Sequence, residues 1–127
     1  MDWHDIALIS AGALGSMVAV IHSLLVRRLM TRPLVAAIRQ EPSFKPSIER
    51  LVPALLDFSG FNWFVSGLVL IAATLWFSDE TKLFASLLVG SSFLFAAVGN
   101  CWGTRGRHPG WVLYAIAVAL IVFGSLR

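Results

Sequence analysis

The stretch Ile6–Val26 reads IALISAGALGSMVAVIHSLLV and contains no Asp, Glu, Lys or Arg. At about 1.5 Å per helical residue, its 21 residues reach about 30 Å, which is the thickness of the hydrocarbon core of a bilayer. The strands of a membrane barrel would alternate apolar and polar residues, and this stretch does not. The sequence therefore predicts a transmembrane helix over residues 6–26.

Three further apolar stretches follow, over roughly 60–77, 83–102 and 111–126, and the last is the shortest. All five prolines lie outside the four stretches, as expected for unbroken helices in lipid. The chain is 57% hydrophobic and 13% charged, whereas an average soluble domain is about 45–50% apolar and about 25% charged. We therefore predict one all-α domain over residues 1–127, a polytopic integral membrane protein built as a four-transmembrane-helix bundle.

The composition also excludes several classes of protein. Intrinsic disorder requires low hydrophobicity and high net charge, which is the opposite of this chain. The single cysteine excludes an intramolecular disulfide framework and a cysteine-rich zinc site. The sequence shows no activated nucleophile, no paired carboxylates within a span and no metal-ligand spacing. We therefore expect no enzyme activity, no cofactor and no bound metal.

The basic residues predict the orientation of the helices. Eight of the ten lie between the first and second spans or between the third and fourth: Arg27, Arg28, Arg32, Arg39, Lys45, Arg50, Arg105 and Arg107. Cytoplasmic loops of membrane proteins carry an excess of Lys and Arg. We therefore expect loops 27–57 and 103–110 to face the cytoplasm and both termini to lie on the outer, periplasmic side of a bacterial inner (plasma) membrane. No basic residue precedes the first span, so we expect that span to be retained rather than cleaved as a signal peptide.

The first cytoplasmic loop has its own helical signals. Residues 33–40 follow the first span after a proline and predict a short helix, and residues 41–46 predict a turn. An apolar stripe then recurs at helical spacing: Ile48, Leu51, Val52 and Leu55. Such a stripe beside charged residues is typical of a helix that lies in the membrane interface. We therefore expect a short interfacial amphipathic segment in this loop.

The basic residues of both cytoplasmic loops form a candidate site for anions or lipid headgroups, because guanidinium groups bind phosphate in a bidentate manner. Its members are Arg27, Arg28, Arg32, Arg105, Arg107 and His108. Alternatively, these residues only fix the topology and contact anionic headgroups of the bilayer without a defined site. Nucleic acid is not an expected partner, since no basic run is dense enough.

Polar residues within the predicted spans form a second candidate site. His22, Asn62 and Asn100 lie at similar depths near the cytoplasmic side. They form either a layer of hydrogen bonds between helices or a cytoplasm-facing site for a small ligand or a proton. We expect His4 and His108 to lie apart from His22, which argues against a two-histidine haem or metal site.

Small residues at four-residue spacing, such as Ala11, Gly15 and Ala19, predict close helix packing within the chain or between chains. With so little mass outside the membrane, we expect an accessory, assembly or interaction subunit of a membrane complex or homo-oligomer. Its partners would be other membrane subunits or further copies of itself. The alternative is a transporter, or a membrane protein that binds a small ligand or lipid around His22, Asn62 and Asn100.

Overall fold

The computed structural model describes residues 1–126, and within them the fold is entirely helical. The helices are α1 (Trp3–Val26), α2 (Arg32–Gln40), α3 (Pro46–Trp76), α4 (Asp79–Thr104) and α5 (Gly110–Ser125). A π-helical segment, η1 (Arg27–Thr31), joins α1 to α2, so that Trp3–Gln40 forms one continuous helix. This long helix, α3 and α4 are long and apolar enough to cross a membrane, whereas α5 is apolar but shorter. The predicted all-α class is confirmed.

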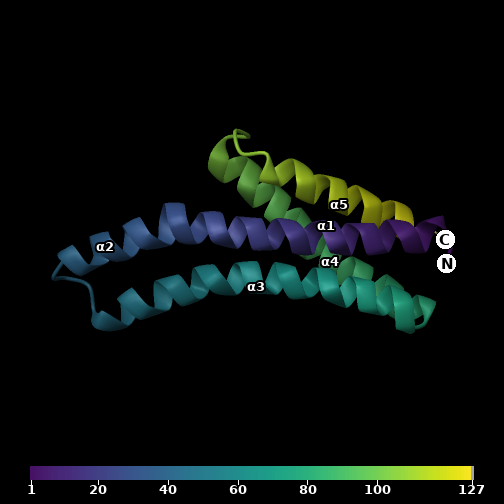
Figure 1. The fold of residues 1–127 in the computed structure, drawn as a ribbon, viewed down its shortest axis with the longest axis horizontal. Helices are drawn as coiled ribbons and strands as arrows, with labels where there is room; N and C mark the ends of the chain where they lie inside the picture. Colours follow the sequence, from purple (N-terminus) through teal and green to yellow (C-terminus); the bar gives the residue numbers. More distant parts are fainter. Residues whose placement is uncertain (127) are drawn as a thin grey trace.

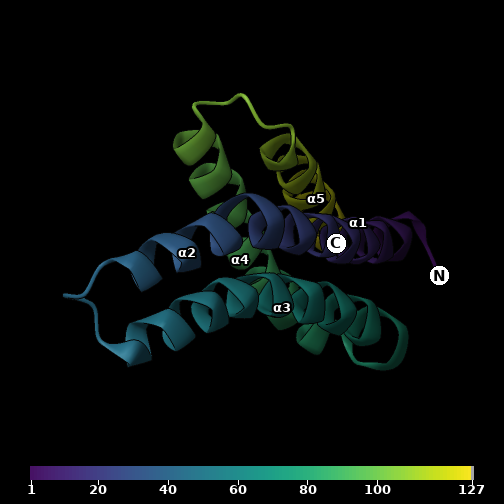
Figure 2. The same cartoon turned by 60° about the vertical axis from the view of Figure 1, so that its left-hand side comes forward.

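The helices form two antiparallel pairs that cross each other. The continuous helix α1–η1–α2 runs beside α3 for almost its whole length (Figure 1). α4 crosses this pair at an angle, and α5 returns from the α4–α5 turn along α1 (Figure 2). Both termini therefore lie at the same end, where the His4 ring stacks on Phe123 and its Nδ1 lies 3.0 Å from the Phe123 carbonyl oxygen. We call this the terminal end.

α1 is the central helix, because α3 and α5 pack along it and α4 reaches it through the side chains of Phe93 and Lys82. One face of α1 carries the predicted small residues Ala11, Gly15 and Ala19, and Ala11 and Ala19 are completely buried there. Gly15 leaves the space into which the Phe93 ring of α4 fits, since a Cβ at Gly15 would lie 2.1 Å from that ring. The small residues therefore serve packing inside the chain, which is one of the two roles that the sequence left open for this face.

The backbones of α1 and α3 approach closely at Gly12 of α1 and Gly67 of α3. A Cβ added to Gly12 would lie 2.5 Å from the carbonyl oxygen of Gly67, and a Cβ on Gly67 would lie 2.3 Å from that of Gly12. Beside this contact, the Ser16 hydroxyl donates a hydrogen bond of 2.9 Å to the Phe64 carbonyl oxygen. Backbone contact of this kind brings two helices close enough for extensive van der Waals packing in a lipid environment.

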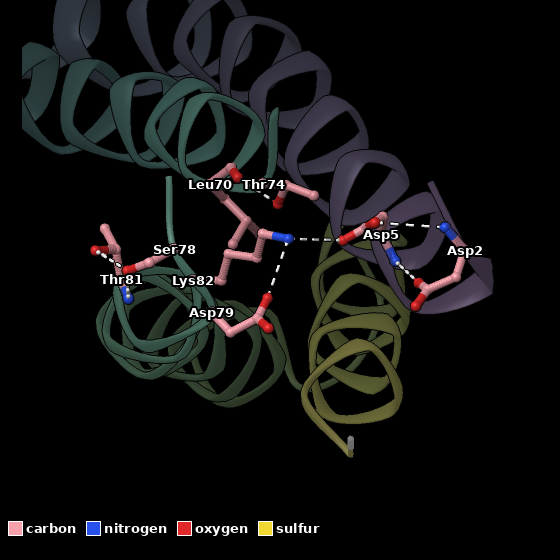
Figure 3. A network of polar contacts seen from close by, with 8 residues as sticks. All are labelled: Asp2, Asp5, Leu70, Thr74, Ser78, Asp79, Thr81 and Lys82. Atoms are coloured by element: carbon pink, nitrogen blue, oxygen red, sulfur yellow. Dashed lines mark hydrogen bonds and ion pairs between the residues drawn. The ribbon is translucent and has the colours of Figure 1, made fainter. Parts of the chain in front are cut away.

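Charged side chains join the helices at the terminal end (Figure 3). Asp2 and Asp5 form a capping box that closes the first turn of α1. The Lys82 Nζ of α4 lies 3.2 Å from Asp5 Oδ1 and 3.3 Å from Asp79 Oδ1. The Lys82 and Asp5 side chains are each only 15% exposed, which strengthens their attraction relative to a fully solvated pair.

The predicted cytoplasmic loop 27–57 is a helical hairpin rather than a loop with a separate interfacial segment. The predicted helix 33–40 and the turn after it are confirmed, but the chain does not break before Pro33, because η1 carries the helix through. The expected amphipathic segment is the first part of α3, which begins at Pro46 and continues through Pro53. Proline at the start of a helix loses no hydrogen bond, so Pro46 is a favourable first residue for this long helix.

The two arms of this helical hairpin, residues 27–40 and 46–59, each extend about 21 Å beyond the predicted spans. Thr31 and Ile38 are buried in the contact between the arms. An ion pair joins Arg27 Nη2 to Asp57 Oδ2 at 2.8 Å near the base, and Arg39 pairs with Glu49 near the tip. Exposed ion pairs contribute little stability, so the buried residues hold the arms together.

Replacement of Gly12 by alanine should destabilise the bundle by about 1–3 kcal/mol, because the new methyl group would force apart the α1 and α3 backbones. Gly99→Ala is the matched control, since a Cβ there meets no atom within 4 Å and should leave stability unchanged or slightly raised. SDS titration in mixed micelles, followed by far-UV circular dichroism, measures both. Equal effects of the two substitutions would contradict the packing described here.

Candidate functional site: a cavity with two histidines

Toward their turn, α4 and α5 diverge from the α1–α3 pair (Figure 2). The divergence leaves three adjoining hollows of about 320, 190 and 160 Å³, and His22 of α1 lines all three. We call these hollows together the inner cavity. Its lining is mostly apolar, with Val26, Met30 and Leu25 among the residues that surround His22. A small, mainly hydrophobic pocket with a few polar groups is typical of a ligand-binding site.

His108 joins His22 in this cavity, where it lines the two smaller hollows. The expectation that the two histidines lie apart is therefore wrong. α4 ends with Arg105 and Gly106 in left-handed conformation, which turns the chain back and places His108 against the helices. Gly110 leaves room for the ring, because a Cβ there would lie 2.9 Å from His108 Nδ1.

The polar groups of the cavity use only part of their hydrogen-bonding capacity. Asn100 Nδ2 donates to the Ala96 carbonyl oxygen at 2.7 Å, within its own helix. The backbone N–H of Gly110 donates to His108 Nδ1 at 3.1 Å, so the proton of the neutral ring sits on Nε2. Among residues 1–126, neither ring nitrogen of His22, nor Asn100 Oδ1, nor His108 Nε2 takes part in a hydrogen bond.

An aromatic cluster lies beside the cavity and links all four long helices. The His22 ring meets Trp63 of α3 edge to face, with centroids 5.3 Å apart. Trp63 contacts Tyr114 of α5 at 5.4 Å, and Tyr114 contacts Phe93 of α4 at 5.3 Å. These bulky rings fill the space between the helices at the level where α4 and α5 begin to diverge from the α1–α3 pair. The cluster therefore separates the inner cavity from the tightly packed core nearer the terminal end.

The structure brings together two of the three polar residues that the sequence grouped. His22 and Asn100 line the same hollows, whereas Asn62 is exposed on the outer side of α3. The neighbouring Trp63 faces the cavity in its place. Thr104 also lines the inner cavity. The sequence could have predicted this, because Thr104 follows Asn100 by one helical turn and so lies on the same face of α4.

The candidate anion site is spread over separate parts of the fold. Arg28 lies in η1, Arg32 begins α2, and Arg105 and Arg107 lie at the α4–α5 turn. All four side chains are exposed, and Arg27 is paired with Asp57. Figure 1 shows the α4–α5 turn to one side of the long α1–α3 pair. Of the six residues, His108 alone belongs to the inner cavity.

Substitutions of His22 separate a packing role from a binding role. His22→Ala should lower the free energy of unfolding by about 1 kcal/mol, because it removes the edge contact with Trp63. His22→Phe keeps an aromatic ring there and should change stability by no more than about 0.5 kcal/mol. SDS titration measures both. Equal destabilisation by the two variants would mean that the ring nitrogens bond within the protein, and the site would then be a packing layer.

The inner cavity offers N–H donors, imidazole and amide acceptors and an apolar wall. Within the described residues 1–126, no group of three or more His, Cys, Asp or Glu side chains could hold a metal ion. Comparisons with protein-family models, with curated proteins and with solved structures found no match.

Proposed function

We propose that this chain is an integral membrane protein that binds a small, largely apolar molecule in the inner cavity. The observation that carries the proposal is the convergence of His22 and His108, from distant parts of the sequence, on one apolar hollow. A ligand with one or two hydrogen-bonding groups would satisfy their unused donor and acceptor positions. The apolar wall would supply most of the binding energy, and the polar groups would fix the orientation.

The hydrogen-bond pattern favours binding over an interhelical polar layer. In such a layer, Asn and His side chains bond to one another across helices. Here the Asn100 amide and the Thr104 hydroxyl bond to carbonyl oxygens of their own helix, at 2.7 Å and 2.6 Å. These contacts satisfy the two side chains without joining any helices. Because these bonds do not involve His22 or His108, both histidines remain available to a ligand.

A binding role also fits the position of the cavity better than a continuous channel does. The part of the bundle between the cavity and the terminal end is filled by buried side chains such as Leu8, Leu70 and Phe93. A pore would require a polar path through this region. We therefore propose a closed-ended site that takes its ligand from the cytoplasm or the inner leaflet.

For the orientation, we propose four membrane crossings with both termini on the outer side of a bacterial inner membrane. The helical hairpin and the α4–α5 turn carry eight basic residues, which supports a cytoplasmic position for that end. α5, with 16 residues, would reach about 24 Å and would cross with slight thinning of the bilayer around it.

A second candidate function is that of an accessory, assembly or interaction subunit. The helical hairpin favours it, because its arms extend beyond the proposed membrane boundary and expose apolar side chains. These include Leu51, Leu55 and Phe58 on the α3 arm, each more than half exposed. Exposure of these apolar side chains to water is unfavourable, so a neighbouring subunit or the membrane interface would cover them.

The topology can be tested by cysteine labelling in a Cys101→Ala background. Ser43→Cys lies in the turn at the tip of the helical hairpin, and Glu80→Cys lies at the terminal end. A membrane-impermeant maleimide should label the Glu80→Cys variant in intact spheroplasts. It should label the Ser43→Cys variant only after permeabilisation. The reverse pattern, or equal labelling of both, would contradict the orientation.

The ligand site can be tested by native mass spectrometry after mild detergent extraction. We expect the wild-type protein to carry a small molecule, and His22→Ala and His108→Ala to lose at least about 90% of it, which corresponds to about 1.4 kcal/mol of binding energy. Asn62→Ala is the matched control, since this amide is exposed outside the cavity, and it should retain the molecule.

The same spectra distinguish the two candidate functions. A bare monomer without a small molecule in the wild-type sample would contradict ligand binding. A complex with another subunit or a second copy, unaffected by His22→Ala, would favour the interaction role instead. Retention of the small molecule by both histidine variants would place its site elsewhere on the chain.

A further inference from the structure

A second groove lies between α1 and α3 and shares no lining residue with the inner cavity. Its volume is about 290 Å³. Its lining is mainly apolar, with one ion pair: Ala19, Val20, Ser23, Leu24, Arg27, Asp57, Gly60, Phe61 and Phe64. We call it the α1–α3 groove. Because α1 and α3 run antiparallel, Arg27 and Asp57 both lie at the end of the groove nearest the helical hairpin.

The floor of this groove is formed by a close contact of the two helices. A Cβ added to Gly60 would lie 1.8 Å from Ser23 Oγ and 3.1 Å from Ser23 Cβ, so α1 and α3 are close together here. Val20, Leu24 and Phe61 stand beside this floor and are 46%, 65% and 64% exposed. These side chains form the apolar walls of the groove.

The ion pair sits at the proposed level of the lipid headgroups. Arg27 directly follows the predicted span 6–26, and Asp57 lies three residues before the span 60–77. From Val20 to Arg27 the helix rises by about 10 Å, which matches the upper part of an acyl chain. The groove therefore presents apolar walls to the chain region and two opposite charges to the headgroup region.

The charges of the groove complement a zwitterionic headgroup. Arg27 uses Nη2 for its 2.8 Å contact with Asp57 Oδ2, and the two side chains remain 62% and 42% exposed. The other guanidinium N–H groups are free to bind phosphate oxygens, and Asp57 Oδ1 is free to accept from an ammonium. A purely anionic headgroup would face repulsion from Asp57, and a quaternary ammonium has no N–H to donate.

We propose that the α1–α3 groove binds one phospholipid whose headgroup joins a phosphate to a primary ammonium, with the phosphate on Arg27, the ammonium on Asp57 and an acyl chain between Leu24 and Phe61. This site refines the sequence-based expectation of an anionic headgroup at Arg27. It is independent of the inner cavity, so either site can fail its test without affecting the other.

Native mass spectrometry with added lipids tests the proposal on the unaltered protein. Ethanolamine, choline and glycerol phospholipids with identical acyl chains are titrated separately. We expect the ethanolamine lipid to bind at least about fivefold more tightly than the other two. Equal binding of all three, or a preference for the glycerol lipid, would overturn the proposal. Glycerophosphoethanolamine, which lacks acyl chains, should not displace the bound lipid, and displacement by it would also overturn the proposal.

Two pairs of variants assign the preference to the ion pair. Asp57→Ala removes both the charge and the acceptor oxygens and should bring ethanolamine and choline lipids to equal affinity, and Arg27→Gln should weaken both by at least about fivefold. Glu49→Ala and Arg39→Gln alter the matching pair near the hairpin tip and should leave the preference intact. An ethanolamine preference that persists in Asp57→Ala would contradict the assignment. Circular dichroism confirms that each variant is folded before comparison.

Discussion

The contact between the backbones of Gly12 and Gly67 is the constraint on which the rest of the fold depends. In the lipid environment that we propose for this chain, helices would gain little from the hydrophobic effect on association, so close van der Waals packing would hold them together. The two glycines let α1 and α3 approach until their backbones touch. α5 then packs along α1, and α4 packs on α5 and α3 and reaches α1 through Phe93.

The same constraint explains where the bundle is open. Near the terminal end, Leu8 of α1 packs against Gly124 of α5, and the helices stay close. Toward the other end, α1 and α3 stay close at Gly60, whereas the rings of Trp63 and Tyr114 stand between α3 and α5. Beyond these rings, α4 and α5 diverge from the α1–α3 pair, and this divergence leaves the inner cavity. Both the tight core and the cavity thus follow from where small and large side chains lie along four helices.

Much of the fold could be predicted from the sequence, because long apolar runs and basic loops carry strong signals. The four helices, the helix over 33–40 and the turn after it are all read from such local patterns. The continuity of α3 from Pro46 was harder to predict, because proline and charge usually mark the end of a span. The π-helical segment η1 has no signal in the sequence that we can identify.

The candidate site was predicted only in part, because depth along a span does not determine the direction of a side chain. His22 and Asn100 line the same hollows, but Asn62 is exposed on α3. A single step along α3 exchanges the exposed Asn62 for the cavity-lining Trp63. The position of His108 depends on the left-handed Arg105 and Gly106, and nothing in a one-dimensional depth profile reveals that turn.

The continuous helix that begins at Trp3 has a mechanical consequence. It runs without interruption from the wall of the inner cavity to the tip of the helical hairpin, so it behaves as a stiff lever. From His22 to Gln40 the lever arm is about 27 Å long. A tilt of about 5° at the cavity would move the tip by about 2 Å. Occupancy of the inner cavity would thereby become a displacement of the hairpin tip.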